Sequence, residues 1–132
     1  MSRAKEVIVI PCSGIGKALG RVSRTATYKV LEERPKNART LCLALLTVGD
    51  DSAGRAVSHT PCIAIDGCPN RCSAKNILAS NGRLLAEVMV SEVLRKNKGL
   101  KPQGIIELND DGLKLADLVA KEVIERMDGV VE

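Results

Sequence analysis

Short apolar runs, several of them rich in β-branched residues, alternate along the chain with longer segments that repeat an apolar residue every three or four positions. The runs are typical of buried strands, and the repeating segments are typical of amphipathic helices. The segment Leu84–Val90 is compatible with either type. The predicted strands are Val7–Ile10, Leu41–Leu46 and Cys62–Ile65. The predicted helices are Ile15–Glu33, Ser52–Ser58, Pro69–Ser80 closed by Asn81-Gly82, Ser91–Lys98, and Asp111–Met127 capped by Asn109 or Asp110.

The alternation of strand and helix predicts an α/β fold. A continuous β-branched run such as Val7–Ile10 is expected of a parallel strand that is covered on both faces. We therefore expect a small three-layer sandwich, with a mostly parallel sheet of about four strands and helices on both faces. Because the chain has 132 residues and no internal repeat, we expect a single domain over residues 1–132.

Composition narrows the possible partners. The chain contains one Tyr and no Phe or Trp, although 45% of its residues are hydrophobic. The core must therefore consist of Val, Ile, Leu and Ala. The net charge is +4, and the basic residues are dispersed among acidic ones. Nucleic-acid binding usually needs a concentrated basic stripe or stacking aromatic residues, so we expect no nucleic-acid partner.

The cysteine content is informative once the compartment is considered. The first six residues are polar and the apolar run that follows is only Val7–Ile10, which does not match a signal peptide. No run approaches the roughly 18–20 apolar residues of a membrane span. We expect a cytoplasmic protein without a membrane partner. Five cysteines in that compartment indicate metal or redox chemistry rather than a disulfide framework.

The segment around Cys68 and Cys72 has the strongest chemical signal. Asp66-Gly67 breaks the preceding strand, and Pro69 suits the first position of a helix. Cys68 would then be the N-cap, with Cys72 one turn later on the same face. Residues four apart on a helix have Cβ atoms about 5–6 Å apart, and a helix N-terminus favours thiolate over thiol. This spacing predicts a pair of thiolates close enough to bind one metal ion.

The predicted topology brings further cysteines to the same place. Ligand sites of open α/β sheets lie at the carboxyl ends of the strands, and Cys12 follows the first strand as Cys68 follows the third. Cys42 joins them if the second strand is short and ends near it, with Leu43–Leu46 as a turn or helix start. If that strand continues to Thr47, Cys42 is a core residue. Cys62 lies at the opposite end of its strand, and we expect it to be buried and structural.

The same residues resemble the DGC-domain family, small prokaryotic proteins named for an Asp-Gly-Cys motif. The matching segments are Asp66-Gly67-Cys68 with Cys72 four positions on, Cys12-Ser13-Gly14 after the first strand, and the intervening Cys42. The sequence departs from the pattern at Ile15, where many relatives have a further cysteine. The resemblance implies zinc binding through four chelating cysteines. Carried over by position, these are Cys12, Cys42, Cys68 and Cys72.

Three functions are compatible with these cysteines. The first is a zinc site, closed if four thiolates bind and open to water or substrate if only three do. The second is a redox or sulfur-transfer enzyme with Cys12 or Cys68 as the nucleophile. His59, the one histidine, is expected to be a surface residue rather than its base. Asp66 is a candidate to orient Cys68 or to cap the helix, and we expect it to cap the helix. The third is an iron–sulfur protein, although the spacing matches none of the usual ferredoxin runs.

Nucleotide binding is not expected. A phosphate-binding loop needs Gly-x4-Gly-Lys followed by Ser or Thr. Around Gly16-Lys17, however, position 11 is Pro and position 18 is Ala. A dinucleotide fingerprint fails as well, because its third glycine would be Gly20, one position late.

Overall fold

The centre of the protein is a parallel sheet of four strands in the order β2-β1-β3-β4. The computed structural model describes residues 6–12, 18–67, 70–104 and 107–129. The strands are β1 (Val7–Pro11), β2 (Ala38–Thr40), β3 (Pro61–Asp66) and β4 (Arg83–Met89). The helices are α1 (Ala18–Glu33), α2 (Leu43–Thr47), α3 (Asp51–His59), α4 (Cys72–Ala79), α5 (Val90–Lys96) and α6 (Asp110–Asp128).

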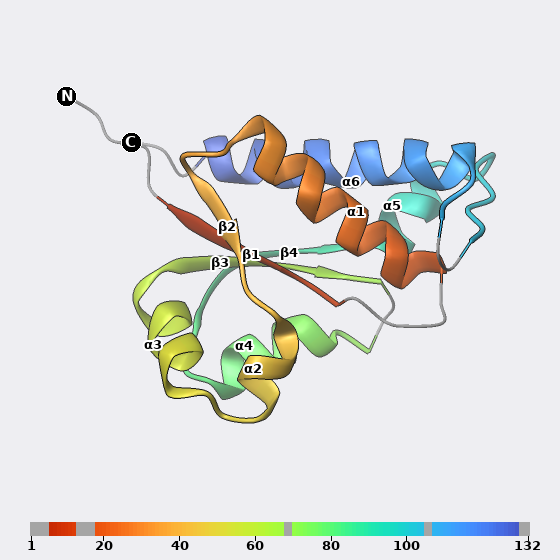
Figure 1. The fold of residues 1–132 in the computed structure, drawn as a ribbon. Coiled ribbons are helices and arrows are strands. Elements are labelled where there is room, and N and C mark those ends of the chain that lie inside the picture. Colours follow the sequence, from red (N-terminus) through yellow and green to blue (C-terminus); the bar gives the residue numbers. More distant parts are fainter. Residues whose placement is uncertain (1–5, 13–17, 68–69, 105–106, 130–132) are drawn as a thin grey trace.

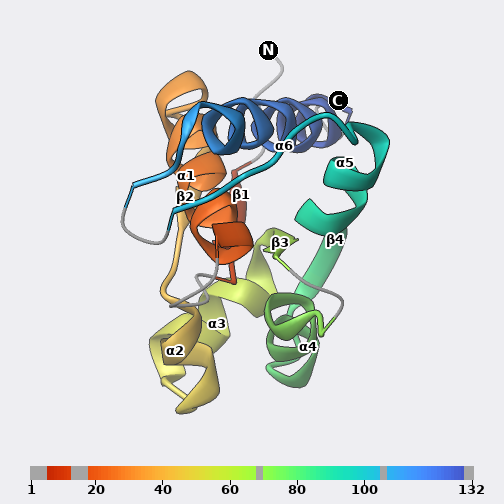
Figure 2. The same ribbon diagram turned by 90° about the vertical axis from the view of Figure 1, so that its right-hand side faces the viewer.

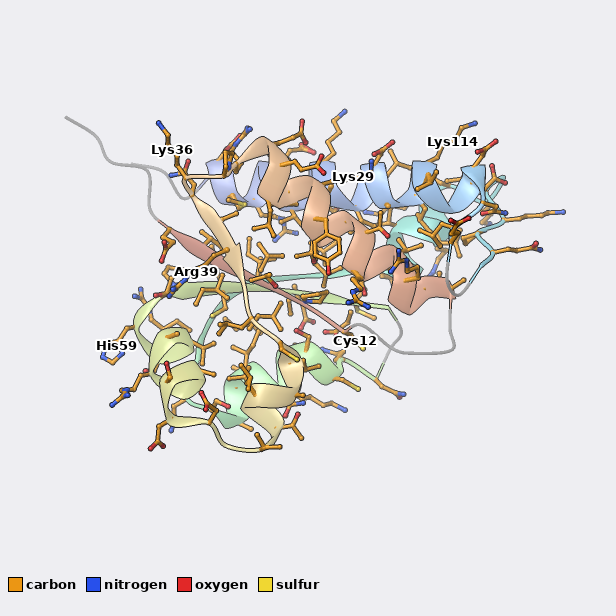
Figure 3. All side chains as sticks on the ribbon, in the orientation of Figure 1. Cys12, Lys29, Lys36, Arg39, His59 and Lys114 are labelled. Carbon is orange, nitrogen blue, oxygen red and sulfur yellow. The ribbon has the colours of Figure 1, made fainter. Side chains whose placement is uncertain are left out.

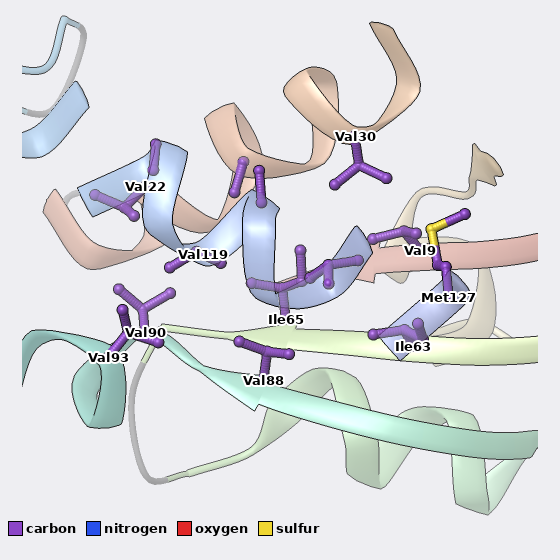
Figure 4. Packing of buried hydrophobic residues seen from close by; sticks show 14 of the residues in the cluster. Val9, Val22, Val30, Ile63, Ile65, Val88, Val90, Val93, Val119 and Met127 are labelled. Carbon is purple, nitrogen blue, oxygen red and sulfur yellow. The ribbon is translucent and has the colours of Figure 1, made fainter. Parts of the chain in front are cut away.

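The helices cover both faces of the sheet, so the expected three-layer sandwich is confirmed. Helices α1, α5 and α6 lie on one face, and α2, α3 and α4 lie on the other (Figures 1 and 2). Side chains of a strand alternate between faces. In β1, Val7 and Val9 accordingly join the cluster under α1, α5 and α6, whereas Ile8 and Ile10 join the cluster under α2, α3 and α4. Figure 4 shows the first cluster.

The predicted strand Leu41–Leu46 is wrong. The structure forms a three-residue strand, Ala38–Thr40, that pairs with β1, and then the short helix α2 over Leu43–Thr47. Leu and Ala favour helix and lack the branching at Cβ that suits strands, so the apolar run was open to either structure. Of the two alternatives for Cys42, the structure has the short strand, with Cys42 at the N-cap of α2.

The predicted start of α4 is also wrong. The helix begins at Cys72 rather than Pro69, and its N-cap is Arg71 in the left-handed conformation, with φ of 55°. Arg71 donates from Nε and Nη2 to Oε2 of Glu87 on β4, at 3.1 and 2.7 Å. Cys68 is therefore not the N-cap of this helix, and Cys68 and Pro69 themselves lie outside the described residues.

The end of α4 agrees with the sequence. Asn81 is in the left-handed conformation, with φ of 60°. The N–H of Gly82 donates to the carbonyl of Ile77 at 2.8 Å, and that of Asn81 donates to Leu78 at 3.0 Å. This pair of bonds is a Schellman motif, which satisfies carbonyl groups that the helix end leaves unpaired.

The remaining elements follow the predictions with small shifts. The ambiguous segment is the strand β4, which pairs in parallel with β3. Asn109 caps α6 by accepting a hydrogen bond from the N–H of Gly112 at 2.8 Å. The predicted start of α1 at Ile15 lies outside the described residues. Within the part of the chain that is described, no helix is both long and apolar enough to cross a membrane.

We predict that Cys62 is protected from thiol reagents in the native protein. Its side chain is 0% exposed, its Sγ–H donates to the carbonyl of Thr60 at 3.2 Å, and burial raises its pKa from 9.0 to about 11. Because the thiolate is the nucleophile, maleimide at pH 8 should label the exposed Cys42 and Cys72 while leaving Cys62 intact. Peptide mapping by mass spectrometry measures this, and unfolding in urea should abolish the protection. Labelling of Cys62 at the rate of Cys42 would contradict the buried position.

Candidate functional site

The strand order reverses between β1 and β3. The chain passes from β1 to β2 on one side and then to β3 on the other, which creates the switch point where open α/β sheets bind ligands. The N–H of Cys12 donates to the carbonyl of Ile65 at 2.8 Å, which extends the pairing of these two strands by one residue. Cys12 therefore stands at the carboxyl end of β1, at the switch point.

Three of the four predicted ligand cysteines line one groove at this edge of the sheet. Cys12 enters it from the end of β1, Cys42 from the junction of β2 and α2, and Cys72 from the first turn of α4. The groove has a volume of about 700 Å³. Its other described lining residues come from β1, α1, the end of β2 and α2: Pro11, Arg24, Thr27, Tyr28, Thr40, Leu41, Leu43, Ala44 and Thr47.

The cysteines are accessible, and two of their elements are linked. Cys42 and Cys72 are exposed, and Cys12 is half-buried. Asn76 of α4 donates to the carbonyl of Cys72 at 2.8 Å and accepts from the hydroxyl of Thr47 on α2 at 3.3 Å. The elements that carry Cys42 and Cys72 are thus joined through side chains, and their thiols face a solvent-accessible groove rather than the core.

The groove cysteines do not form a closed metal cluster. Among the residues that the structure describes, no three His, Cys, Asp or Glu side chains lie together closely enough to hold a metal ion. Cys12, Cys42 and Cys72 therefore share a groove without forming a ready-made coordination sphere. Cys68, the fourth predicted ligand, lies outside the described residues.

Asp66 anchors the first turn of α4, as the capping interpretation predicts. Its carboxylate is 1% exposed and accepts from the backbone N–H groups of Ser73 at 2.7 Å and Ala74 at 3.2 Å. The hydroxyl of Ser73 donates in turn to the carbonyl of Ile10 on β1 at 2.6 Å. Burial raises the pKa of Asp66, and the two backbone hydrogen bonds partly offset that rise.

Gly67 has a separate role in the Asp-Gly-Cys motif. A Cβ atom at this position would lie 3.0 Å from the carbonyl carbon and oxygen of Leu19 and 3.1 Å from the nitrogen of Gly20. These are backbone atoms of α1 and cannot rotate away. The motif therefore needs glycine here because the start of α1 packs directly against the chain as it leaves β3.

His59 takes no part in the groove. It is the last residue of α3 and is exposed, and its Nδ1 lies 2.8 Å from the carbonyl oxygen of Arg55. Because α3 leads into the amino end of β3, His59 lies near the opposite edge of the sheet from Cys12 (Figure 3). This position agrees with the expectation that His59 is a surface residue.

The sequence predictions missed one wall of the groove, which consists of Arg24, Thr27 and Tyr28 on α1. These residues are spaced three and four apart, so they share one face of the helix. The signal in the sequence that points to this wall is the one aromatic residue of the chain. In a core built without aromatic residues, a tyrosine is a candidate for the surface or a binding site.

We predict that Asp66→Asn lowers the free energy of unfolding by about 1–3 kcal/mol, because an amide supplies one acceptor where two N–H groups need partners. Burial raises the pKa of Asp66 in the folded state, so the folded protein binds a proton more tightly than the unfolded chain. The contribution of Asp66 to stability is present below the pKa that this residue has in the unfolded chain. It is lost as pH rises through the higher pKa of the folded state. The difference between wild type and variant should therefore be larger near pH 4 than at pH 7.

Urea unfolding at several pH values measures this difference. The control is Asp51→Asn, which removes an exposed carboxyl from the first turn of α3. A difference for Asp66→Asn that grows toward neutral pH would contradict the burial of this carboxyl.

Comparison with known proteins identifies the family. Searches of curated proteins and of solved structures gave no match. The sequence profile of the DGC domain matches residues 8–112, a range that includes Cys12, Cys42, Asp66-Gly67-Cys68 and Cys72. Because the match covers most of the chain, this protein belongs to the DGC domain family.

Proposed function

We propose that this protein binds zinc at the carboxyl edge of its sheet through Cys12, Cys42, Cys68 and Cys72. The observation that supports the proposal is the convergence of three of these cysteines on one groove, from the end of β1, the junction of β2 and α2, and the first turn of α4. Four thiolates are a favourable ligand set for zinc, which they bind tetrahedrally at about 2.3 Å. A cytoplasmic location, where thiols stay reduced, is part of this proposal.

The separation of the groove cysteines bears on the kind of zinc site. Since no three described donors are assembled around one point, ligation by all four requires the thiols to approach one another when the ion binds. Two of the ligands are exposed. The described buried residues of both hydrophobic clusters lie in the strands and helices. We therefore propose an exchangeable ion at an accessible site, in contrast to a structural ion that the fold requires.

A second candidate function is thiol-based redox or sulfur-transfer chemistry, with Cys12 or Cys68 as the nucleophile. The accessible groove favours it, because Cys42 and Cys72 are exposed there and either thiol can resolve a disulfide or persulfide. Metal content distinguishes the two functions.

We predict about one zinc per chain in protein purified without added metal or an affinity tag, measured by elemental analysis. Replacing any of Cys12, Cys42, Cys68 or Cys72 by Ser should lower the zinc content sharply, because each change removes one of the four thiolate ligands. Cys62→Ser is the matched control. It changes a buried cysteine that does not line the groove, its hydroxyl can still donate to Thr60, and its zinc content should equal that of wild type.

Three results would contradict the zinc proposal. Protein without metal but with reactive thiols would favour the redox function. Iron with visible absorption would favour an iron–sulfur cluster. Equal loss of zinc from all five cysteine variants would count against the assignment of Cys62 as structural and of the other four as ligands.

We also predict that removing zinc leaves the protein folded. After treatment with a chelator, the far-ultraviolet circular dichroism should be unchanged and thermal unfolding should remain cooperative. The Tm should fall only by the amount that corresponds to the lost binding free energy of zinc to the native state. Small zinc domains that depend on their metal instead lose their structure under this treatment, and that outcome would identify a structural ion.

A further inference from the structure

The wall of the groove on α1 carries a positive charge. Among the described residues that line the groove, Arg24 is the one arginine, and there is no lysine. No described aspartate or glutamate lines it. Thr27, Thr40 and Thr47 add hydroxyl groups, and Pro11, Leu41, Leu43 and Ala44 add apolar surface. The groove therefore combines one cation, several hydrogen-bonding groups and apolar surface with three cysteines.

Tyr28 orients the guanidinium group of Arg24. The Nε of Arg24 donates to the hydroxyl oxygen of Tyr28 at 3.2 Å, and its guanidinium carbon lies 6.0 Å from the centre of the ring. A guanidinium has five N–H groups, so this contact leaves the four on Nη1 and Nη2 for other acceptors. No described carboxylate forms an ion pair with Arg24. The two terminal nitrogens are a paired donor of the kind that binds a carboxylate.

We infer that the groove binds a small anionic sulfur compound, of the class of low-molecular-weight thiols that carry a carboxylate. The carboxylate binds Arg24, a short alkyl chain contacts the apolar lining, and the sulfur meets Cys12, Cys42 or Cys72. The inference rests on the proposed function, because it uses the same groove cysteines. It adds a second, organic molecule that binds in the groove and states the charge and chemical class of that molecule, which the zinc proposal leaves open.

Thiol–disulfide exchange provides a direct probe of this selectivity. A groove thiolate attacks one sulfur of a small disulfide RS–SR, which serves as the oxidant. A bond forms between the cysteine sulfur and that atom, the S–S bond of the reagent breaks, and the second half leaves as RS⁻ with the electron pair. The product is a mixed disulfide whose position mass spectrometry identifies.

The experiment uses metal-free protein and three disulfides of similar size: the anionic 3,3′-dithiodipropionate, the neutral 2-hydroxyethyl disulfide and the cationic cystamine. Rates at each groove cysteine are compared for each reagent between wild type and Arg24→Gln, so that the intrinsic reactivity of the reagent cancels. We expect the variant to react roughly 3–10 times more slowly with the anionic reagent, at low salt, from the loss of one nearby charge. The neutral rate should be unchanged, and the cationic rate should rise.

Three control variants and a change of ionic strength test the cause of that selectivity. Arg24→Lys retains the charge and should keep most of the preference for the anionic reagent. Tyr28→Phe removes the hydroxyl that orients Arg24 and should give an intermediate loss. Arg55→Gln changes the net charge equally, but at an exposed residue of α3 that does not line the groove, and should have no effect. The preference should also shrink as ionic strength rises.

Equal changes for all three reagents, or an unchanged anionic rate in Arg24→Gln, would overturn the inference. The result is separable from the zinc proposal because the exchange is measured without metal. Zinc bound with no charge preference would overturn this inference alone. A charge preference in protein that binds no zinc would overturn the metal proposal alone.

Discussion

The parallel pairing of β1 with β3 is the constraint on which the rest of the structure depends. Residues Val7–Ile10 and Cys62–Ile65 are almost completely buried, and both strands supply both hydrophobic clusters. Each strand pairs on both sides, so their backbone groups are satisfied within the sheet. Because the two strands run in the same direction and the chain leaves them toward different neighbours, their carboxyl ends meet at one point. The order of the strands therefore places the groove at the carboxyl ends of β1 and β3.

The segments that carry Cys72 and Cys42 differ in how they are bonded to the central strands β1 and β3. Cys72 is followed at once by Ser73, which is bonded through its backbone to Asp66 at the end of β3 and through its hydroxyl to Ile10 of β1. Cys42 follows β2, an edge strand of three residues that pairs on one side only. A hydrogen bond from Thr47 to Asn76 links α2, the helix that Cys42 caps, to α4, the helix that carries Cys72. The described hydrogen bonds therefore tie the wall that carries Cys72 directly to both central strands, whereas Cys42 follows an edge strand.

The sequence predicted the features that depend on local pattern and failed where distant residues decide. β1 and β3 were found almost to the residue because β-branched runs suit buried strands. The common edge of the cysteines followed from parallel topology. The start of α4 was missed because Glu87, sixteen positions away, holds Arg71 outside the helix. The wall on α1 was missed because only packing shows which face of a helix borders a groove.

The single aromatic side chain of this protein is also its built-in optical reporter. Tyr28 lines the groove and is 47% exposed, and the chain has no Trp to mask or quench its emission. All intrinsic fluorescence of the folded protein therefore originates at one wall of the groove. A ligand that displaces Arg24 from the tyrosine hydroxyl, or a metal that draws the cysteines together, changes the surroundings of the sole fluorophore. Occupancy of the site can thus be followed by emission from the unlabelled, unmodified protein.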